Sequence, residues 1–159
     1  MIAVREYDPD RDEDALRACV VELQDYERGY APGMPPGAEM VGPYVALMME
    51  RCELFGGKIF LAETEGRVVG LACVWGKVTS DEPDDDPAAY AYLSDIVVRS
   101  GYRGRGVGRA LMQTVERYAR ECGMSVLRVR MLARNGGARR FYEKHGFGEV
   151  ELEMAKRLG

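Results

Sequence analysis

Three glycines within five residues, Gly104, Gly106 and Gly108, separate an apolar run from an amphipathic pattern in this chain. Glycine costs roughly 1 kcal/mol in a helix interior relative to alanine, so this spacing excludes a continuous helix through the segment. The residues before it, AAYAYLSDIVV (88–98), are typical of a strand. The apolar positions after it recur at helical spacing as far as Cys122. We therefore expect a strand, a glycine-rich turn and a helix in direct succession.

A strand–turn–helix unit of this kind directs backbone N–H groups and the positive end of a helix dipole toward one point. Arg103 and Arg105 add forked donors that suit phosphate oxygens. A dinucleotide fingerprint that begins at Gly104 would lack its third glycine, and a P-loop that begins at Gly101 would lack its lysine. The turn therefore predicts an anion site of another kind, and the alternative is a flexible connection with solvated arginines.

Charge is divided unevenly along the chain. Residues 1–98 carry 8 Lys or Arg and 20 Asp or Glu, a balance of −12, whereas residues 99–159 carry 14 and 6, a balance of +8. The basic part begins at the glycine-rich turn, where an anion is expected. The acidic part includes the segment TSDEPDDDP (79–87), which suits a cationic ligand or simply keeps the protein soluble.

Length and composition fit one domain, residues 1–159, that can bury a core without disulfides or metal. The four cysteines lie far apart, form no CxxC pair and accompany a single histidine, so we expect reduced thiols and no metal site. Acidic residues near the N-terminus do not fit a secretory signal, and no apolar run approaches the roughly 20 residues that span a bilayer. These observations predict a cytoplasmic protein that binds no membrane.

The hydrophobic pattern predicts an α/β fold with the element order β-α-α-β-β-β-α-β-α-β. One hairpin and two crossover helices indicate a mixed, mostly antiparallel central sheet flanked by helices. Helices are expected at 12–28, from the loop 29–38 to Gly56–Gly57, from Val107 to Gly123 and at 135–145. Strands are expected at 2–7, twice within 58–75 around a turn at Glu65–Gly66, and at 88–98, 125–132 and 149–158.

A second segment, NGGARRFYEKHGF (135–147), begins with Asn135, a natural helix N-cap. Phe141, Tyr142 and His145 follow at three- and four-residue spacing, so one face of this short helix is expected to be buried. Taken alone, the pattern favours a core position for Tyr142 over a catalytic one.

Together the two segments resemble the GNAT superfamily of N-acetyltransferases. The glycine motif of that family, Gln/Arg-x-x-Gly-x-Gly/Ala, is matched by Arg103, Gly106 and Gly108. The pattern N..A..FY...GF follows some thirty residues later, and the resemblance covers nearly the whole chain.

The resemblance implies acetyl-CoA as co-substrate. Its pyrophosphate would lie on the backbone amides of residues 103–108, and its pantetheine arm would follow a strand that splays from the next one. Asn135 matches a family asparagine that touches the coenzyme. The implied coenzyme-binding residues are Ile96, Val97, Val98, Arg103, Gly104, Arg105, Gly106, Val107, Gly108 and Asn135.

The family reaction is direct attack of a primary amine on the thioester in a ternary complex. Tyr142 matches the family tyrosine that faces the thioester sulfur, which implies a general acid. A thiol has a pKa near 8.5 and tyrosine about 10, so full proton transfer is uphill by roughly 2 kcal/mol, and a strengthening hydrogen bond suffices. By family analogy, the N–H of Ile96 would stabilise the tetrahedral oxyanion.

The proton of the acceptor amine requires a base. An alkyl ammonium has a pKa of about 10, so only roughly one amine in a thousand is nucleophilic at pH 7. Asp95, on the strand beside the expected thioester, is a candidate, but strand alternation alone does not determine which face meets substrate. A solvated or paired carboxylate is an equal alternative, and Glu63, Tyr92 or water are further candidates.

The acceptor class stays open between a small cationic amine and a protein lysine or N-terminus. After the segment GF the family usually has two strands and a loop over the acceptor, whereas about a dozen residues follow here. We therefore expect either an open site or a homodimer in which a second subunit completes it. A non-catalytic acyl-CoA-binding regulatory module and a nucleic-acid-binding protein are the competing classes. The intact glycine motif and Tyr142 argue for the enzyme, with no nucleic acid as partner.

Overall fold

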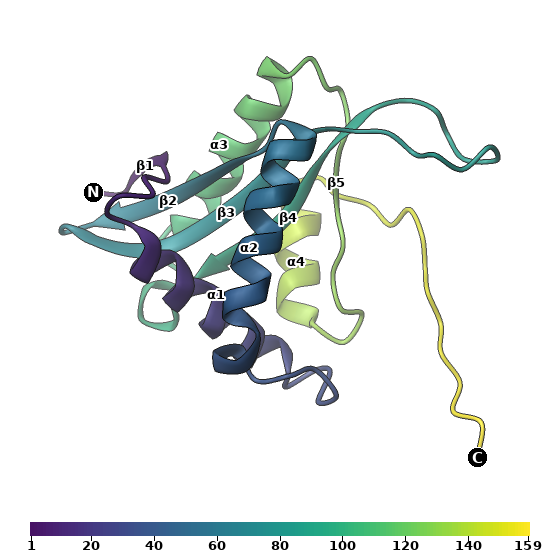
Figure 1. Ribbon diagram of the computed structural model, residues 1–159, viewed down its shortest axis with the longest axis horizontal. Helices are drawn as coiled ribbons and strands as arrows, with labels where there is room; N and C mark the ends of the chain where they lie inside the picture. The colour runs from purple at the N-terminus through teal and green to yellow at the C-terminus, as the bar shows by residue number, and fades with distance from the viewer.

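A five-stranded sheet in the order β1-β2-β3-β4-β5 lies at the centre of the computed structural model, which describes residues 1–159 (Figure 1). The first four strands are antiparallel to their neighbours, and β5 is parallel to β4. The expected mixed, mostly antiparallel sheet is confirmed. The strands are β1 (Ala3–Glu6), β2 (Lys58–Thr64), β3 (Arg67–Val78), β4 (Tyr90–Val98) and β5 (Leu127–Val129).

Helices cover both faces of this sheet (Figure 1). Two of them, α1 (Glu13–Glu27) and α2 (Gly37–Phe55), bury Leu16 and Met48 against Leu61 and Leu71 of the sheet. On the other face, α3 (Val107–Glu121) packs its apolar stripe on the alternate residues of the same strands. The short α4 (Gly136–Lys144) lies on the α3 side, and a 3-10 turn (Ser100–Tyr102) leads from β4 toward α3. None of the helices combines the length and the hydropathy needed to cross a membrane.

Local sequence signals set most of the element ends. The hairpin between β2 and β3 turns at Glu65 and Gly66, both with positive φ, as expected. Gly56 closes α2 in the left-handed conformation. At the start of α4 the Asn135 side chain accepts a hydrogen bond of 3.0 Å from the N–H of Ala138, which confirms the predicted N-cap.

A β-bulge at Ser94 divides β4 into two parts. Leu93 pairs with Val74 and Asp95 pairs with Cys73, so Ser94 has no opposite residue on β3. The extra residue reverses the alternation of side chains along the strand. Leu93 belongs to the core under α3, whereas Val97 belongs to the core under α1 and α2. Asp95, which shares the parity of Val97, therefore also faces α1 and α2.

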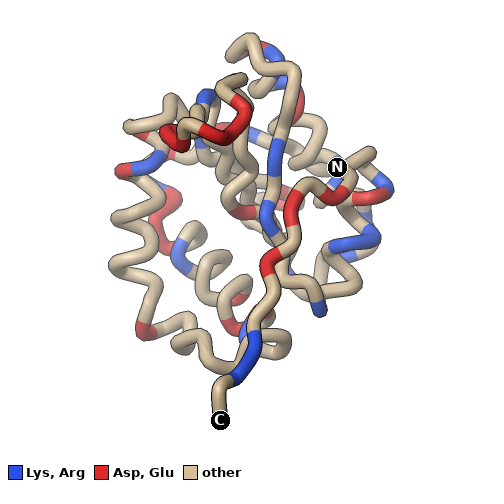
Figure 2. The backbone as a smooth tube through the Cα atoms, turned by 90° about the vertical axis from the view of Figure 1, so that its right-hand side faces the viewer, with Lys and Arg blue, Asp and Glu red and all other residues tan.

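The expectation of a final strand at 149–158 was wrong. This segment is an irregular, exposed tail that runs away from the sheet (Figures 1 and 2). Its apolar residues alternate as in a strand, but they are 71–89% exposed: Val150, Leu152, Met154 and Leu158. A strand pattern becomes a strand only where a neighbour accepts its backbone hydrogen bonds, and the tail has none. The strand expected at 125–132 is also shorter, because it separates from β4 after Val129.

Candidate active site

A cavity of about 710 Å³ lies between α1, the C-terminal part of β4, the start of α3 and the chain around α4. It exists because β4 and β5 diverge: their ladder ends at Leu93 and Val129, while β4 continues to Val98. The wall includes Val97 from the α1 and α2 face together with Ile96 and Val98 from the other face. The cavity therefore opens into the gap between the two strands.

The strand edge inside this gap carries backbone groups that no strand pairs. The N–H of Arg99 donates to the carbonyl of Val69 on β3 at 2.9 Å. In an antiparallel pair, the backbone N–H and C=O groups of successive residues point alternately toward the partner strand and away from it. The backbone groups of Val97 therefore also face β3, and those of Ile96 and Val98 face the gap. In agreement, Arg103 Nε reaches the carbonyl of Val98 at 3.0 Å from the gap side. An extended ligand with amide groups can add to this edge like a strand.

The glycine-rich turn lies at one end of the cavity. Gly104 and Gly106 have positive φ (73° and 87°), a conformation that side chains other than glycine adopt with strain. Gly106 is the N-cap residue of α3, and no side chain caps that helix, so the amides of its first turn are free to bind an anion. At Gly108 a Cβ would come within 3.0 Å of the Phe141 ring, so glycine also permits the close packing of α3 and α4.

Eight of the ten predicted coenzyme-binding residues line the cavity, and two do not. Arg105 lies outside, with its guanidinium 5.6 Å from the centre of the Tyr102 ring. Val107 is buried in the core under α3, so only its backbone could meet a ligand. The lining residues are Ile96, Val97, Val98, Arg103, Gly104, Gly106, Gly108 and Asn135.

Arg103 is held against α1 and is not a freely solvated arginine. Its guanidinium lies 4.7 Å from the centre of the Tyr26 ring and 4.0 Å from the carboxylate of Glu22. Glu22 also accepts hydrogen bonds from the Arg99 side chain and from the Ser100 N–H. These contacts fix the glycine-rich turn to α1 on one side of the cavity.

Tyr142 projects from α4 into the cavity wall opposite α1. Burial raises the pKa of its phenol well above the usual value of 10, and the nearby carboxylates of Glu27 and Asp95 raise it further. The phenol therefore stays protonated at neutral pH and is a hydrogen-bond donor. This state suits stabilisation of a negative charge that develops in the cavity.

Asp95 is a paired carboxylate behind the cavity rather than part of its wall. Its side chain, 6% exposed, accepts one hydrogen bond from the Tyr44 hydroxyl on α2 and one of 2.7 Å from Ser94 Oγ. Burial raises the pKa of this carboxyl, while the two donors oppose that effect. Between the alternatives from the sequence, the geometry favours the paired carboxylate.

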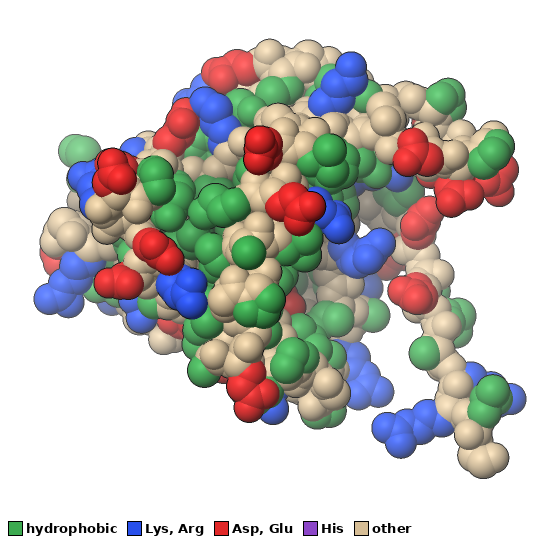
Figure 3. Space-filling view, in the orientation of Figure 1, with side chains coloured by type: hydrophobic (Ala, Val, Ile, Leu, Met, Phe, Trp, Pro, Cys, Tyr) green, Lys and Arg blue, Asp and Glu red, His purple; other side chains and the backbone are tan.

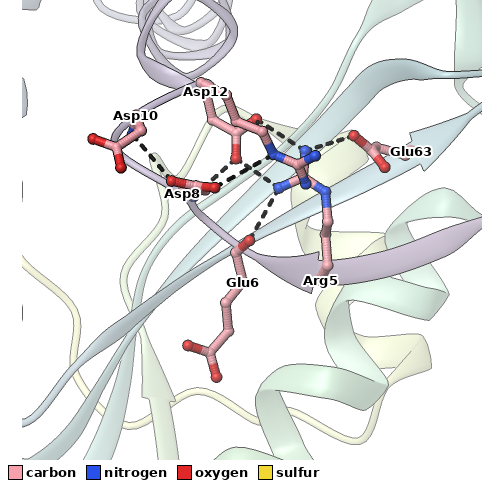
Figure 4. Close-up of polar contacts among 7 residues, drawn as sticks. Arg5, Glu6, Asp8, Asp10, Asp12 and Glu63 are labelled. Atoms are coloured by element: carbon pink, nitrogen blue, oxygen red, sulfur yellow. Dashed lines mark hydrogen bonds and ion pairs between the residues drawn. The ribbon is translucent and has the colours of Figure 1, made fainter.

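The other candidates for a base lie elsewhere. Glu63 is bound by Arg5, which also holds Asp12, so it belongs to an ion-pair cluster that fastens β1 to β2 and to the start of α1 (Figure 4). Tyr92 stacks on Trp75 with ring centres 4.9 Å apart and does not line the cavity. The acidic loop 79–87 projects from the body of the protein and contributes no residue to the wall (Figure 3).

Glu27, the last residue of α1, lines the cavity and was not among the residues selected from sequence. Burial raises the pKa of its carboxyl, and the charge of Asp95 adds to that effect. No signal in the sequence selected it, since it lies at the end of the helix expected at 12–28, directly before the loop 29–38. Nothing in the local pattern of α1 distinguishes Glu27 from its solvated neighbours.

An uncapped helix start, an open strand edge and a buried phenol thus share one cavity, and such features suit a phosphate-bearing ligand with an extended arm. Sequence comparison defines the family: the chain belongs to the acetyltransferase (GNAT) family, whose model matches residues 14–147.

Two curated relatives are similar to parts of the chain. The uncharacterized N-acetyltransferase MJ1207 of Methanocaldococcus jannaschii is 31% identical over 121 residues, which are 72% of this chain and 50% of that protein. The uncharacterized N-acetyltransferase YycN of Bacillus subtilis is 32% identical over 77 residues, 48% of this chain and 49% of its own. The chain thus spans about half the length of these relatives.

Solved structures share the fold over almost the entire chain. A mutant of the BH1408 protein from Bacillus halodurans superposes with a TM-score of 0.85 at 16% identity, covering 98% of this chain and 99% of its own. The aminoglycoside N-acetyltransferase AAC(6')-Iy in complex with CoA has a TM-score of 0.69 at 18% identity and covers 99% of both chains. At these identities the likeness concerns the fold alone.

Proposed function

We propose that this protein is an acetyl-CoA-dependent N-acetyltransferase, formed by residues 1–159 as one domain, that acetylates a primary amine by direct attack in a ternary complex. One observation carries the proposal: the open β4 edge, the uncapped start of α3 and the phenol of Tyr142 surround the same cavity. The family to which the chain belongs supports the same activity. The proposal includes a cytoplasmic location and no metal.

The residues present fit the coenzyme. The positive φ of Gly104 and Gly106 lets the turn present its backbone amides at the start of α3, which suits a pyrophosphate. Arg103 lies beside this point with a charged fork of donors, although it is shared with Glu22 and Tyr26. The backbone of Ile96 and Val98 offers the gap edge to the amide groups of the pantetheine arm.

Bound acetyl-CoA supplies the activated acetyl group, and the chain orients it and manages charge. The N–H of Ile96 faces the gap and can donate to the oxyanion that forms on the carbonyl. Tyr142 can donate its O–H to the sulfur as the thiolate leaves. Since burial raises the pKa of this phenol above 10, full proton transfer would exceed the roughly 2 kcal/mol of an unperturbed pair. Tyr142 therefore acts mainly by a hydrogen bond that strengthens as charge develops.

The acceptor proposed is a small cationic amine. Glu27 in the wall and Asp95 behind it make the α1 side of the cavity negative, which favours an ammonium group. An aminoglycoside N-acetyltransferase with the same fold acts on such a substrate class, as its name states. A protein amine is the second candidate. The tail 149–158 lies away from the body of the protein and does not line the cavity, so it does not block a large acceptor (Figure 1).

The test is release of free thiol from acetyl-CoA by the purified protein with a panel of amines: a diamine, a polyamine, an aminoglycoside and a lysine-containing peptide. Turnover with any of them supports the transferase. Binding of acetyl-CoA without turnover on the whole panel would instead support a regulatory module. Salt-dependent DNA or RNA binding that coenzyme A does not displace would support nucleic-acid binding. A single profile by gel filtration determines whether the protein is a homodimer.

A further inference from the structure

We infer that Glu27 is the group of this chain that binds the ammonium ion of the acceptor and receives its proton. The inference rests on the proposed N-acetyltransferase function and names, within it, both a catalytic residue and the chemical class of the acceptor, an alkylammonium ion. The attacking nitrogen must lose a proton in the cavity, so its base must be a group that reaches the cavity.

The other acids near the cavity, and those named as candidate bases, have partners elsewhere in the chain. Glu22 binds Arg99 and the Ser100 N–H, and Glu63 binds Arg5. Asp95 accepts hydrogen bonds from Tyr44 and Ser94 and does not line the cavity. Glu27 is the carboxylate in the cavity wall, and its side chain has no hydrogen bond or ion pair within the chain, although its backbone carbonyl accepts from the N–H groups of Tyr30 and Ala31. It is therefore free to meet a ligand.

The position of Glu27 at the end of α1 favours a cation. The C-terminal end of a helix carries roughly half a negative charge, and the last turn of α1 contains no basic residue to neutralise it. The adjacent Arg28 directs its side chain to the carbonyl of Met34 in the following loop, 2.9 Å away. The α1 side of the cavity thus attracts a positive charge, while the start of α3 attracts a negative one.

The environment of Glu27 also suits a proton acceptor. The charge of Asp95 on β4 raises the pKa of Glu27, and the charge of Glu27 raises the pKa of Tyr44 on α2 and of Tyr142 on α4. The same cavity wall also contains basic residues, none of which lowers the pKa of Glu27: Arg103, Arg109, Arg130 and Lys144. Burial and the charge of Asp95 raise the pKa of Glu27, so its carboxylate is a stronger base than a solvated one.

The ammonium ion passes one proton to the Glu27 carboxylate, and the neutral amine attacks the acetyl carbon. The C–N bond forms and the C–S bond breaks while Tyr142, which keeps its own proton, donates a hydrogen bond to the leaving sulfur. The thiolate then receives the second nitrogen proton and becomes the thiol of coenzyme A. Glu27 returns its proton to solvent after the amide leaves. The products are the acetamide, coenzyme A and one proton.

The experiment compares Glu27→Gln with a matched control, Glu53→Gln, which alters an exposed glutamate on α2. Each protein is tested with 1,5-diaminopentane, which is an ammonium ion at pH 7, and with methoxyamine, which is already neutral there. We expect Glu27→Gln to lower kcat/KM for the diamine by roughly 10²- to 10⁴-fold and to lower it for methoxyamine far less. The acidic limb of the pH profile for the diamine should move from the pKa of Glu27 to that of the free amine, about 10, and Glu27→Asp should restore part of the rate.

An equal loss with both amines, or an unchanged pH profile, would refute the assignment of Glu27. Affinity for acetyl-CoA, measured on each variant, should stay within about twofold and shows that the variant is folded. Calorimetric binding of 1,5-diaminopentane to the protein loaded with coenzyme A gives a readout without turnover. If wild type binds the diamine, Glu27→Gln does not and neither turns over, the proposed function fails while the ammonium site stands.

Discussion

The hydroxyl of Tyr44 on α2 donates a hydrogen bond to the buried carboxylate of Asp95 on β4, and this contact joins two elements at the back of the cavity. It is possible only because the bulge at Ser94 rotates Asp95 toward α1 and α2. The carboxylate thereby becomes part of the support of the site, and Glu27 is left as the acid in its wall.

The first prediction concerns this contact. Replacing Tyr44 by Phe leaves Asp95 with Ser94 as its side-chain donor, so its pKa should rise further. We expect the free energy of unfolding to fall by about 1–3 kcal/mol, the range for a buried group that loses a partner. Urea denaturation measures it. Tyr30→Phe, which removes a hydroxyl at the surface, should change stability by less than about 0.5 kcal/mol.

A second prediction separates catalysis from coenzyme binding at Tyr142. Tyr142→Phe should keep the affinity for acetyl-CoA and lower turnover by about tenfold or more, because the leaving sulfur loses its donor. Thiol-release assays measure turnover, and equilibrium binding measures the affinity for acetyl-CoA. As a control, Tyr118→Phe removes a hydrogen bond to the carbonyl of Gly56 away from the cavity and should affect stability only. Unchanged turnover in Tyr142→Phe would exclude its catalytic role.

A third prediction tests the glycine-rich turn. Gly106 has a φ of 87°, and the only atom near a Cβ there is in the Ile2 side chain at 3.9 Å, so Gly106→Ala acts through backbone strain. We expect a loss of stability of about 1 kcal/mol and weaker binding of coenzyme A. Gly101→Ala, in the same segment, meets no atom within 4 Å and no positive φ, and it should be neutral in both measurements. Equal effects of the two substitutions would contradict the proposed role of the turn.

A fourth prediction follows from the ion pairs of Arg5 with Asp12 and Glu63, which lie outside the cavity. The hydrogen bonds from Arg5 lower the pKa of Asp12 to about 2, from an ordinary value of 3.8. Because the folded pKa is lower, this stabilisation, about 2 kcal/mol, is complete above pH 4 and disappears as the pH falls toward 2. Comparing acid denaturation of wild type and Asp12→Asn should show this difference narrowing over that range.

The control for this measurement is Asp10→Asn, which changes an exposed aspartate in the same turn. Its stability should follow that of wild type at every pH. If Asp12→Asn and wild type lose stability in parallel between pH 4 and pH 2, the ion pair does not supply the expected stabilisation.

Several features of the fold and the site follow from local sequence. The turn at Glu65–Gly66, the left-handed Gly56 at the end of α2 and the cap at Asn135 were all predicted, because each depends on a few neighbouring residues. The strand, the glycine-rich turn and the helix around Gly106 were predicted for the same reason. The resemblance of this turn and of the Tyr142 segment to the family supplied the rest of the site, and the family model confirms that membership.

The sequence by itself determined the order of the elements up to α4, the conformation of their ends and the place of the glycine-rich turn between β4 and α3. Only the tertiary structure decided which face Asp95 occupies, since a bulge changes strand parity and its position depends on pairing with β3. Glu27 and Tyr142 line the same cavity only because β4 and β5 diverge after Val129. For the tail 149–158, apolar alternation predicted a strand, and the absence of a pairing neighbour left it exposed. Local preference fixes conformation residue by residue, whereas pairing and proximity are properties of the assembled sheet.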